Sequence, residues 1–272
     1  MESFVVNNVI AWCCAFSPVG KAKATNLLGV ISVVALSLLA TGCGQTPAAS
    51  FRLNLVESSK QQLTTSQEQQ VATILAALFG TPDEPRVPPE INLDVAKLKL
   101  AAGPVRSDIV GRKNGLYREH CAHCHGVTGD GMGPTAAFLN PYPRDYRPGV
   151  FKFKSTERAD KPTHPDLVMV LRNGLAGSSM PSFALLSDAK IDALAEYVKY
   201  LSIRGEVELS LMRAYFELDD EDEGVLPQSR EFLFEEIIDP VTEMWAAADD
   251  AIIDVPDMPA DLDMVASIAK GK

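Results

Sequence analysis

Basic side chains are scarce in this 272-residue sequence, which has 25 lysines and arginines against 36 aspartates and glutamates and a formal net charge of −11 at pH 7. Proteins that bind nucleic acid carry a basic patch, usually on a basic domain. The composition therefore excludes DNA and RNA as expected partners. Residues 206–272 hold 19 acidic and only 4 basic side chains, so a mildly basic body precedes an acidic C-terminal extension.

Cysteine is also scarce. The five cysteines stand at positions 13, 14, 43, 121 and 124, an odd and clustered set. A small secreted domain built on disulfides has an even number of cysteines spread along the chain. The sequence does not fit such a scaffold, and each group of cysteines needs its own explanation.

Long hydrophobic runs are lacking. Residues 27–40 form an apolar run of 14 residues, and a membrane-spanning helix usually needs roughly 17–25 residues. Lys21 and Lys23 precede the run and small residues follow it, as in a secretory signal peptide. We therefore expect residues 1–42 to be a signal peptide and the protein to be exported, with an uncleaved anchor as the alternative.

Cys43 follows Thr41 and Gly42 directly, and this arrangement resembles the bacterial lipoprotein signal. The resemblance implies that Cys43 becomes the lipid-bearing first residue of a mature protein attached to the membrane on its periplasmic side. Ala40 stands where that family usually has Leu, Val or Ile, so ordinary cleavage stays open. Cys13 and Cys14 would be removed with the signal peptide.

Strand-like alternation is rare in the mature chain, where residues 91–100 are the best strand candidate. Apolar residues instead recur at helical spacing. Thr65 to Glu68 has the spacing of a capping box, and Gly80 and Pro82 end the helix that follows. The pattern predicts an all-α fold with helices over 65–79, 108–120, 166–173, 188–201, 207–218 and 232–245.

The motif with specific chemistry is Cys121-Ala122-His123-Cys124-His125. Cys-x-x-Cys-His is the attachment signature of a c-type haem. Two thiols at this spacing at the end of a helix reach the two vinyl groups on one porphyrin edge, and the next histidine then faces the iron. A zinc site needs four ligands, and no second cysteine pair is present. A thioredoxin-like disulfide needs a βαβ setting, which the pattern does not show.

Several motifs together resemble a class I, single-haem cytochrome c. They are Tyr117, the Cys-x-x-Cys-His-Gly sequence, the glycine-rich run 129–134 and Met180-Pro181-Ser182-Phe183 before a closing helix. The resemblance covers residues 106–204 and implies one covalent haem c. It leaves residues 43–105 as a linker with an N-terminal helical extension and residues 205–272 as an acidic helical extension.

The family pattern also implies roles for individual residues. His125 and Met180 are the expected axial ligands of the iron, with Met132 as a second candidate for the distal position. The carbonyl of Pro134 matches the group that accepts the proton on the far nitrogen of the proximal histidine, a bond that fixes the tautomer. Independently of the family, Arg144 lies in a segment whose donors suit the haem propionates. His120, His123 and His164 are expected on the solvent side.

With both axial positions filled, the iron gains and loses one electron without binding a substrate, so we expect an electron carrier with a redox-protein partner and no enzymatic activity. Two alternatives stay open: a haem-bearing subunit of a membrane oxidase or reductase complex, and a gas- or peroxide-binding domain with an open sixth position. Residues 267–272 are similar to 107–113, which also leaves open a second haem domain further along the gene.

Overall fold

The computed structural model describes residues 48–218, 224–255, 257–260 and 262–271, all of which belong to the second of two compact units, 48–272. The predicted signal peptide, the predicted lipidation site Cys43 and the acidic residues 219–223 lie outside the described residues. No described helix is both long enough and apolar enough to cross a membrane.

The fold is all-α, as predicted, with one two-stranded hairpin. Its α-helices are α2 (Leu55–Lys60), α3 (Thr65–Phe79), α4 (Val95–Ala101), α5 (Leu116–His120), α6 (Ala122–His125), α7 (His164–Asn173), α8 (Asp188–Ala214), α9 (Asp239–Ala246) and α10 (Met264–Lys270). Short 3-10 turns lie at Ala136–Phe138 (η3), Tyr215–Glu217 (η4) and Ala247–Asp249 (η7), and a π-helical segment, η6, covers Phe232–Ile238. Strands β1 (Arg106–Ser107) and β2 (Lys113–Asn114) pair antiparallel.

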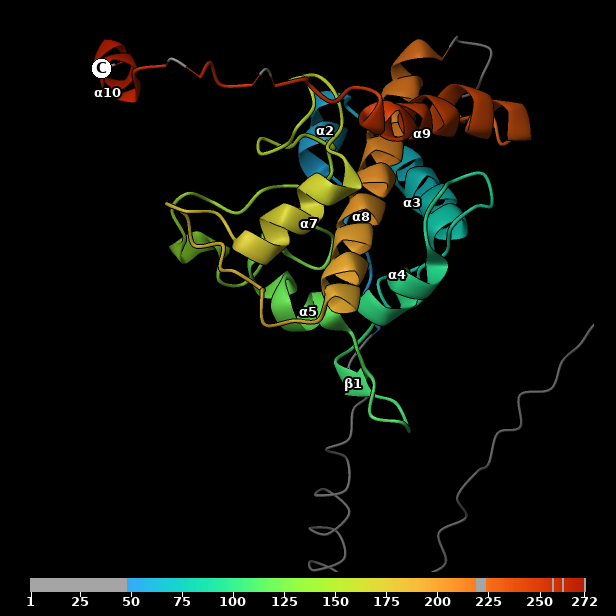
Figure 1. The fold of residues 1–272 in the computed structure, drawn as a ribbon. Helices are drawn as coiled ribbons and strands as arrows, with labels where there is room; N and C mark the ends of the chain where they lie inside the picture. The colour runs from blue at the N-terminus through green and yellow to red at the C-terminus, as the bar shows by residue number, and fades with distance from the viewer. Residues whose placement is uncertain (1–47, 219–223, 256, 261, 272) are drawn as a thin grey trace, which may run out of the picture. The chain divides into compact units, whose positions relative to one another are not determined.

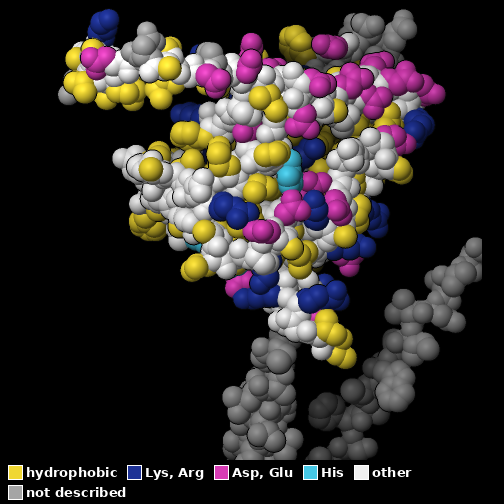
Figure 2. All heavy atoms as spheres, in the orientation of Figure 1, with side chains coloured by type: hydrophobic (Ala, Val, Ile, Leu, Met, Phe, Trp, Pro, Cys, Tyr) yellow, Lys and Arg dark blue, Asp and Glu magenta, His cyan; other side chains and the backbone are white. Residues whose placement is uncertain are grey.

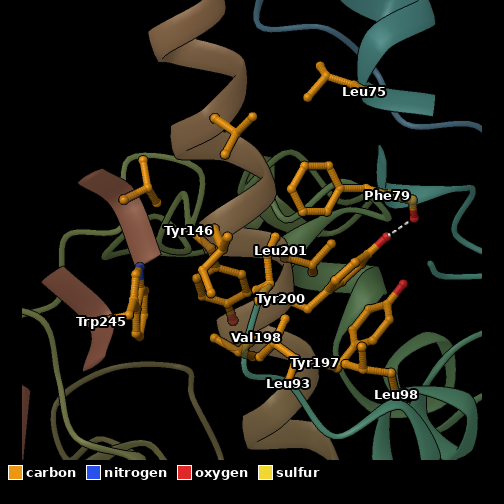
Figure 3. Close-up of a cluster of buried hydrophobic side chains, with 14 of the residues drawn as sticks. Leu75, Phe79, Leu93, Leu98, Tyr146, Tyr197, Val198, Tyr200, Leu201 and Trp245 are labelled. Carbon is orange, nitrogen blue, oxygen red and sulfur yellow. Dashed lines mark hydrogen bonds between the residues drawn. The ribbon is translucent and has the colours of Figure 1, made fainter. Parts of the chain in front are cut away.

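Helix α8 is the centre of the structure. It has 27 residues, and α3 and α4 pack on one side of it while α7 packs on the other (Figure 1). The core forms along its length, where Tyr197, Tyr200 and Leu201 meet Phe79 of α3 (Figure 3). The hydroxyl of Tyr200 donates to the carbonyl of Phe79 at 2.5 Å, which satisfies a polar group inside this core.

The N-terminal extension belongs to this core. Helix α3 occupies the predicted residues, although its capping box uses Thr64 and Gln67, one position before the predicted pair. The predicted strand at 91–100 is wrong, because α4 begins there. The Asp94 side chain accepts from the backbone N–H of Ala96 and Lys97 and so starts a helix.

The helix predicted over 108–120 forms only at its end, in α5. The Asp108 carboxylate accepts from the backbone N–H of Val110 and Arg112, which closes a hairpin turn. Gly115 has a φ of 75°, and a Cβ there would lie 2.3 Å from the carbonyl oxygen of Pro104. A helix that continued through Gly115 would need a negative φ at this residue and would lose its close approach to the Pro104 backbone. The segment similar to 267–272 is thus a hairpin, whereas 267–270 lie in α10.

The C-terminal extension starts inside α8. The predicted boundary between residues 204 and 205 falls within this helix, and the predicted apolar stripe at Val207, Leu211 and Tyr215 continues it with buried side chains. The predicted helix at 232–245 is present as η6 followed by α9, which pack on α8. Acidic side chains gather over α9 and the neighbouring chain (Figure 2).

The buried carboxylate of Asp166 fixes the start of α7. It accepts from the backbone N–H groups of Thr163 at 2.9 Å and Ser155 at 3.0 Å, and from the Ser155 hydroxyl. Burial opposes ionisation of this carboxyl, but these hydrogen bonds outweigh burial and hold its pKa below the ordinary value. The ionised form therefore stabilises the folded chain.

We expect Asp166→Asn to lower the free energy of unfolding by about 1–2 kcal/mol at pH 7, because the amide keeps only one acceptor oxygen. A lowered folded-state pKa adds stability above the unfolded pKa of about 4, and this contribution is lost as the pH falls below it. Urea unfolding should therefore show a difference that shrinks below about pH 4. Glu157→Gln, at an exposed position nearby, is the control. A difference that does not change with pH contradicts this account.

Candidate functional site

The Cys-x-x-Cys-His motif forms a tight double turn. Cys121 ends α5 and caps α6, and both Cys121 and Cys124 are free thiols. The Tyr117 hydroxyl donates to the carbonyl of Gly126 at 2.9 Å, across the motif. Gly126 has a φ of 74°, and a Cβ there would lie 2.2 Å from the Asp130 carboxylate. These contacts fix where the two thiols and His125 point.

The motif opens onto a largely apolar cavity of about 380 Å³. Its walls come from α5 and α6, the loop after η3, helix α7 and the loop between α7 and α8. Both cysteines, His125, Arg144 and Met180 line it, as do Tyr146, Phe151, Leu171 and Phe183. A cavity of this size and character suits a cofactor or small-molecule ligand.

His125 is buried and held from two sides. Its Nδ1 lies 3.0 Å from the backbone carbonyl oxygen of Arg144, and its ring stacks on Tyr146 with centroids 4.6 Å apart and planes inclined by 22°. Burial lowers its pKa below the ordinary value, although the bond to Arg144 opposes this. The ring is therefore neutral with Nδ1 engaged, which leaves Nε2 as the nitrogen that can bind a metal.

The carbonyl that Nδ1 reaches differs from the predicted one. Pro134 is exposed, and the neighbouring Gly133 packs against the backbone of Ala122 and His123. Arg144 takes the role predicted for Pro134, because the loop after η3 returns to the cavity. Arg144 itself is half-buried and lines the cavity.

Met180 lines the same cavity from the loop between α7 and α8. This loop is tied by Leu175, whose N–H donates to the Met180 carbonyl at 3.1 Å, and by Phe183, whose N–H donates to the Leu171 carbonyl. Met180 is half-buried. Met132, the second candidate for the distal ligand, is 61 % exposed and is not among the lining residues.

The thiols and the other histidines have distinct surroundings. Burial raises the pKa of Cys121 to about 12. His123 is exposed, as predicted, and His164 pairs with Asp192 at 2.5 Å, away from the cavity. His120 and His123 both line the cavity, but His120 differs from its prediction because it is half-buried, with its ring 5.9 Å from that of Phe183.

The residues around the cavity fit a covalently attached haem. Two free thiols, a neutral imidazole with Nε2 available and a thioether meet at one apolar cavity, which matches the donor set of haem c. In the described part of the chain, no three His, Cys, Asp or Glu side chains converge as a metal site, so the zinc alternative has no ligand set there.

Comparison with known proteins supports this assignment. The family model described as "Cytochrome C oxidase, cbb3-type, subunit III" matches residues 111–198. Residues 111–198 are therefore similar to a cytochrome c domain. The domain implies covalently bound haem c and a role in electron transfer.

A chain of the solved Kuenenia stuttgartiensis reducing HAO-like protein complex Kustc0457/Kustc0458 is similar at 23 % sequence identity. The TM-score is 0.32, and the match covers 49 % of this chain and 60 % of that one. This chain therefore matches less than two thirds of the length of that relative. No curated protein matches the sequence.

The sequence pattern predicts the ligand candidates but not the groups that hold them in place. Tyr146 belongs to the same segment as Arg144, and no motif includes Phe151. Both line the cavity, and Tyr146 stacks on His125. The available signal was two aromatic residues on either side of Pro148-Gly149 in a segment without helical spacing.

Proposed function

We propose that this protein is an exported one-electron carrier with a single haem c attached to Cys121 and Cys124, and with His125 and Met180 as axial ligands. It acts as a carrier in a respiratory chain rather than as an enzyme. The N-terminal lipid at Cys43, or an uncleaved anchor, attaches it to the membrane on the periplasmic side. Its partner is another redox protein.

One observation carries this proposal: both thiols, His125 and Met180 line the same apolar cavity. The thiols would hold the cofactor covalently, while His125 would give Nε2 to the iron. Met180 would be the second ligand from the protein. An iron that is held by both residues would have no free position for a substrate. Haem c supplies one-electron chemistry, alternating between Fe(III) and Fe(II).

The chain's own residues support this chemistry. The Arg144 carbonyl holds the proton on Nδ1 of His125, which strengthens the imidazole as a ligand. The apolar walls from α7 and the loop before α8 exclude water. Such burial, together with His/Met ligation, raises the reduction potential. Arg144 stands at the cavity where it could pair with a propionate.

The axial assignment predicts that Met180→Ala abolishes the charge-transfer band that ferric haem shows when methionine is bound. The vacated position should then bind CO in the ferrous state, which the parent protein should resist. Met132→Ala, at an exposed position in the same domain, is the matched control and should keep the parent spectrum. A Met180→Ala spectrum identical to that of the parent rules out this ligand and favours the open-site alternative.

A second function has support from the matched family, whose description names an oxidase subunit. On this alternative the chain is the haem-bearing subunit of a membrane oxidase or reductase complex. Detergent extraction followed by native gel electrophoresis distinguishes a free carrier from a subunit of a complex. Stable co-migration of the haem with a larger complex supports the subunit, and a haem band at the mass of the single chain supports the free carrier.

A further inference from the structure

The loop between η3 and α7 covers residues 139–163, about 25 residues without a helix. Connections this long and irregular are uncommon in compact domains and usually have a function. Because few of its own backbone groups pair with each other, such a loop has low local stability unless other parts of the chain hold it. Its inner end carries the groups that contact His125.

Two residues at the inner end of the loop orient His125. Arg144 provides the carbonyl at 3.0 Å from Nδ1, and Tyr146 provides the stacked ring. Tyr146 is only 6 % exposed, and its N–H donates to the carbonyl of Gly129 at 2.7 Å. The position of the His125 ring therefore depends on the conformation of this loop.

The outer half of the loop is held by the C-terminal extension. The Phe151 ring stacks on Tyr146 and meets the Trp245 ring of α9 edge to face, with centroids 6.2 Å apart. Further along, the Ile253 N–H donates to the Ser155 carbonyl at 2.9 Å, beside an antiparallel bridge between Thr156 and Ile252. A series of ring contacts thus connects His125 to Trp245 of the extension. A backbone bridge at residues 155 and 156 joins the outer half of the loop to the same extension.

Trp245 is itself firmly held. It is 4 % exposed, it lies on the same side of α8 as Tyr146 (Figure 3), and its Nε1 donates to Glu206 at 2.7 Å. Glu206 also pairs with Lys161 from the loop, and a Cβ on Gly149 would lie 2.3 Å from the Glu206 carboxyl. The extension, α8 and the loop therefore share one buried contact region.

We propose that the C-terminal extension positions the axial histidine. Trp245 and the backbone at Ile252 and Ile253 hold the loop of residues 139–163 in the conformation that presents Arg144 and Tyr146 to His125. The inference rests on the proposed function, because it concerns His125 as an iron ligand. Trp245 and Ile253 touch no ligand atom and act only through the loop.

Loosening the loop has a defined electronic consequence. A hydrogen bond from Nδ1 to a carbonyl makes the imidazole a stronger donor to a metal, which favours Fe(III). When the loop moves away, the bond to Arg144 is made less often and Fe(III) loses this support. With the cavity equally buried, the reduction potential should then rise.

Ile253→Pro tests the effect of the loop on the reduction potential. Proline removes the N–H that donates to the Ser155 carbonyl, at a half-exposed position outside the aromatic contacts. The control is Val255→Pro, two residues on, where the side chain is 80 % exposed. In equilibrium with a redox mediator, we expect Ile253→Pro to favour Fe(II) at least threefold more than the parent. Val255→Pro should match the parent.

Trp245→Ala tests the aromatic contact through amide hydrogen exchange in the haem-loaded protein. We expect the Tyr146 amide to exchange at least tenfold faster than in the parent, and Trp245→Phe to restore most of the protection. Ile238→Ala, a buried truncation in the same extension, is the control for general loss of stability. If Trp245→Ala does not fold, Ile253→Pro still decides the question through the potential.

An unchanged or lowered potential in Ile253→Pro, with haem bound, overturns the inference. Equal Tyr146 exchange in Trp245→Ala and Ile238→Ala overturns it as well. Absence of covalent haem in the parent would instead overturn the proposed function, so the two failures are distinguishable.

Discussion

His125→Ala is expected to lose the low-spin haem spectrum and, with it, the folded state of the domain. His125 lines a cavity of about 380 Å³ together with both cysteines and Met180. Without the bond from His125 to the iron, the haem would be held by its thioether bonds alone and would no longer stabilise the folded arrangement of the residues around it. Cofactor binding energy is thus folding energy in this protein.

His123→Ala is the matched control for this experiment. His123 belongs to the same turn, stands between the two cysteines and is exposed. It should keep the spectrum and the thermal midpoint of the parent. Absorption spectra and circular dichroism of both variants, purified in parallel, make the comparison. A His125→Ala protein with a normal low-spin spectrum contradicts the ligand assignment.

Deletion of residues 206–272 is expected to prevent folding. From the sequence, this segment is predicted to be an acidic helical extension outside the part that resembles cytochrome c. The structure places Val207, Leu211 and Met212 of α8 in the core, together with Ile238 and Trp245. Each fully buried side chain of this kind contributes about 1.5–3 kcal/mol, so the loss of all five is as large as the whole stability of a typical domain, about 5–15 kcal/mol.

A shorter deletion separates burial from charge. Removing residues 255–272 takes away several acidic groups but leaves Trp245 and the bond between Ile253 and Ser155. The described side chains in this segment are exposed, so thermal unfolding and the haem spectrum should match the parent. A folded, haem-loaded protein after deletion of 206–272 would show that the extension is dispensable.

The sequence predicted most helices because their apolar stripes and caps are local. Helix α7 has a capping box, and α3 ends at Gly80, whose φ is 71°. The failure at 108–120 has a local cause too, the turn around Asp108, which competes with helix formation. Helix α8 runs past its predicted end at residue 201, and the cause is a tertiary contact. Gly205 suggests an end, yet it stands there because a Cβ would lie 2.4 Å from the Arg147 Cα.

The part of the candidate site that could be predicted is the part in which covalent attachment of a haem requires a fixed spacing between residues. Cys121, Cys124 and His125 must lie together in one turn, and Met180 stands out in a glycine-rich loop. The carbonyl that holds Nδ1 could not be found this way, because any backbone carbonyl can accept and the path of the 139–163 loop decides which one does. The same holds for Trp245, which lies 120 residues from His125 in sequence.

The central claim is that Cys121 and Cys124 carry one haem between them. Trypsin cleavage after Arg118 and Arg144 releases a peptide that contains both cysteines and His125. Tandem mass spectrometry of this peptide should show one haem joined by two thioether bonds, with no thiol left to alkylate. A peptide in which both cysteines react with an alkylating agent and no haem mass is present would contradict the account.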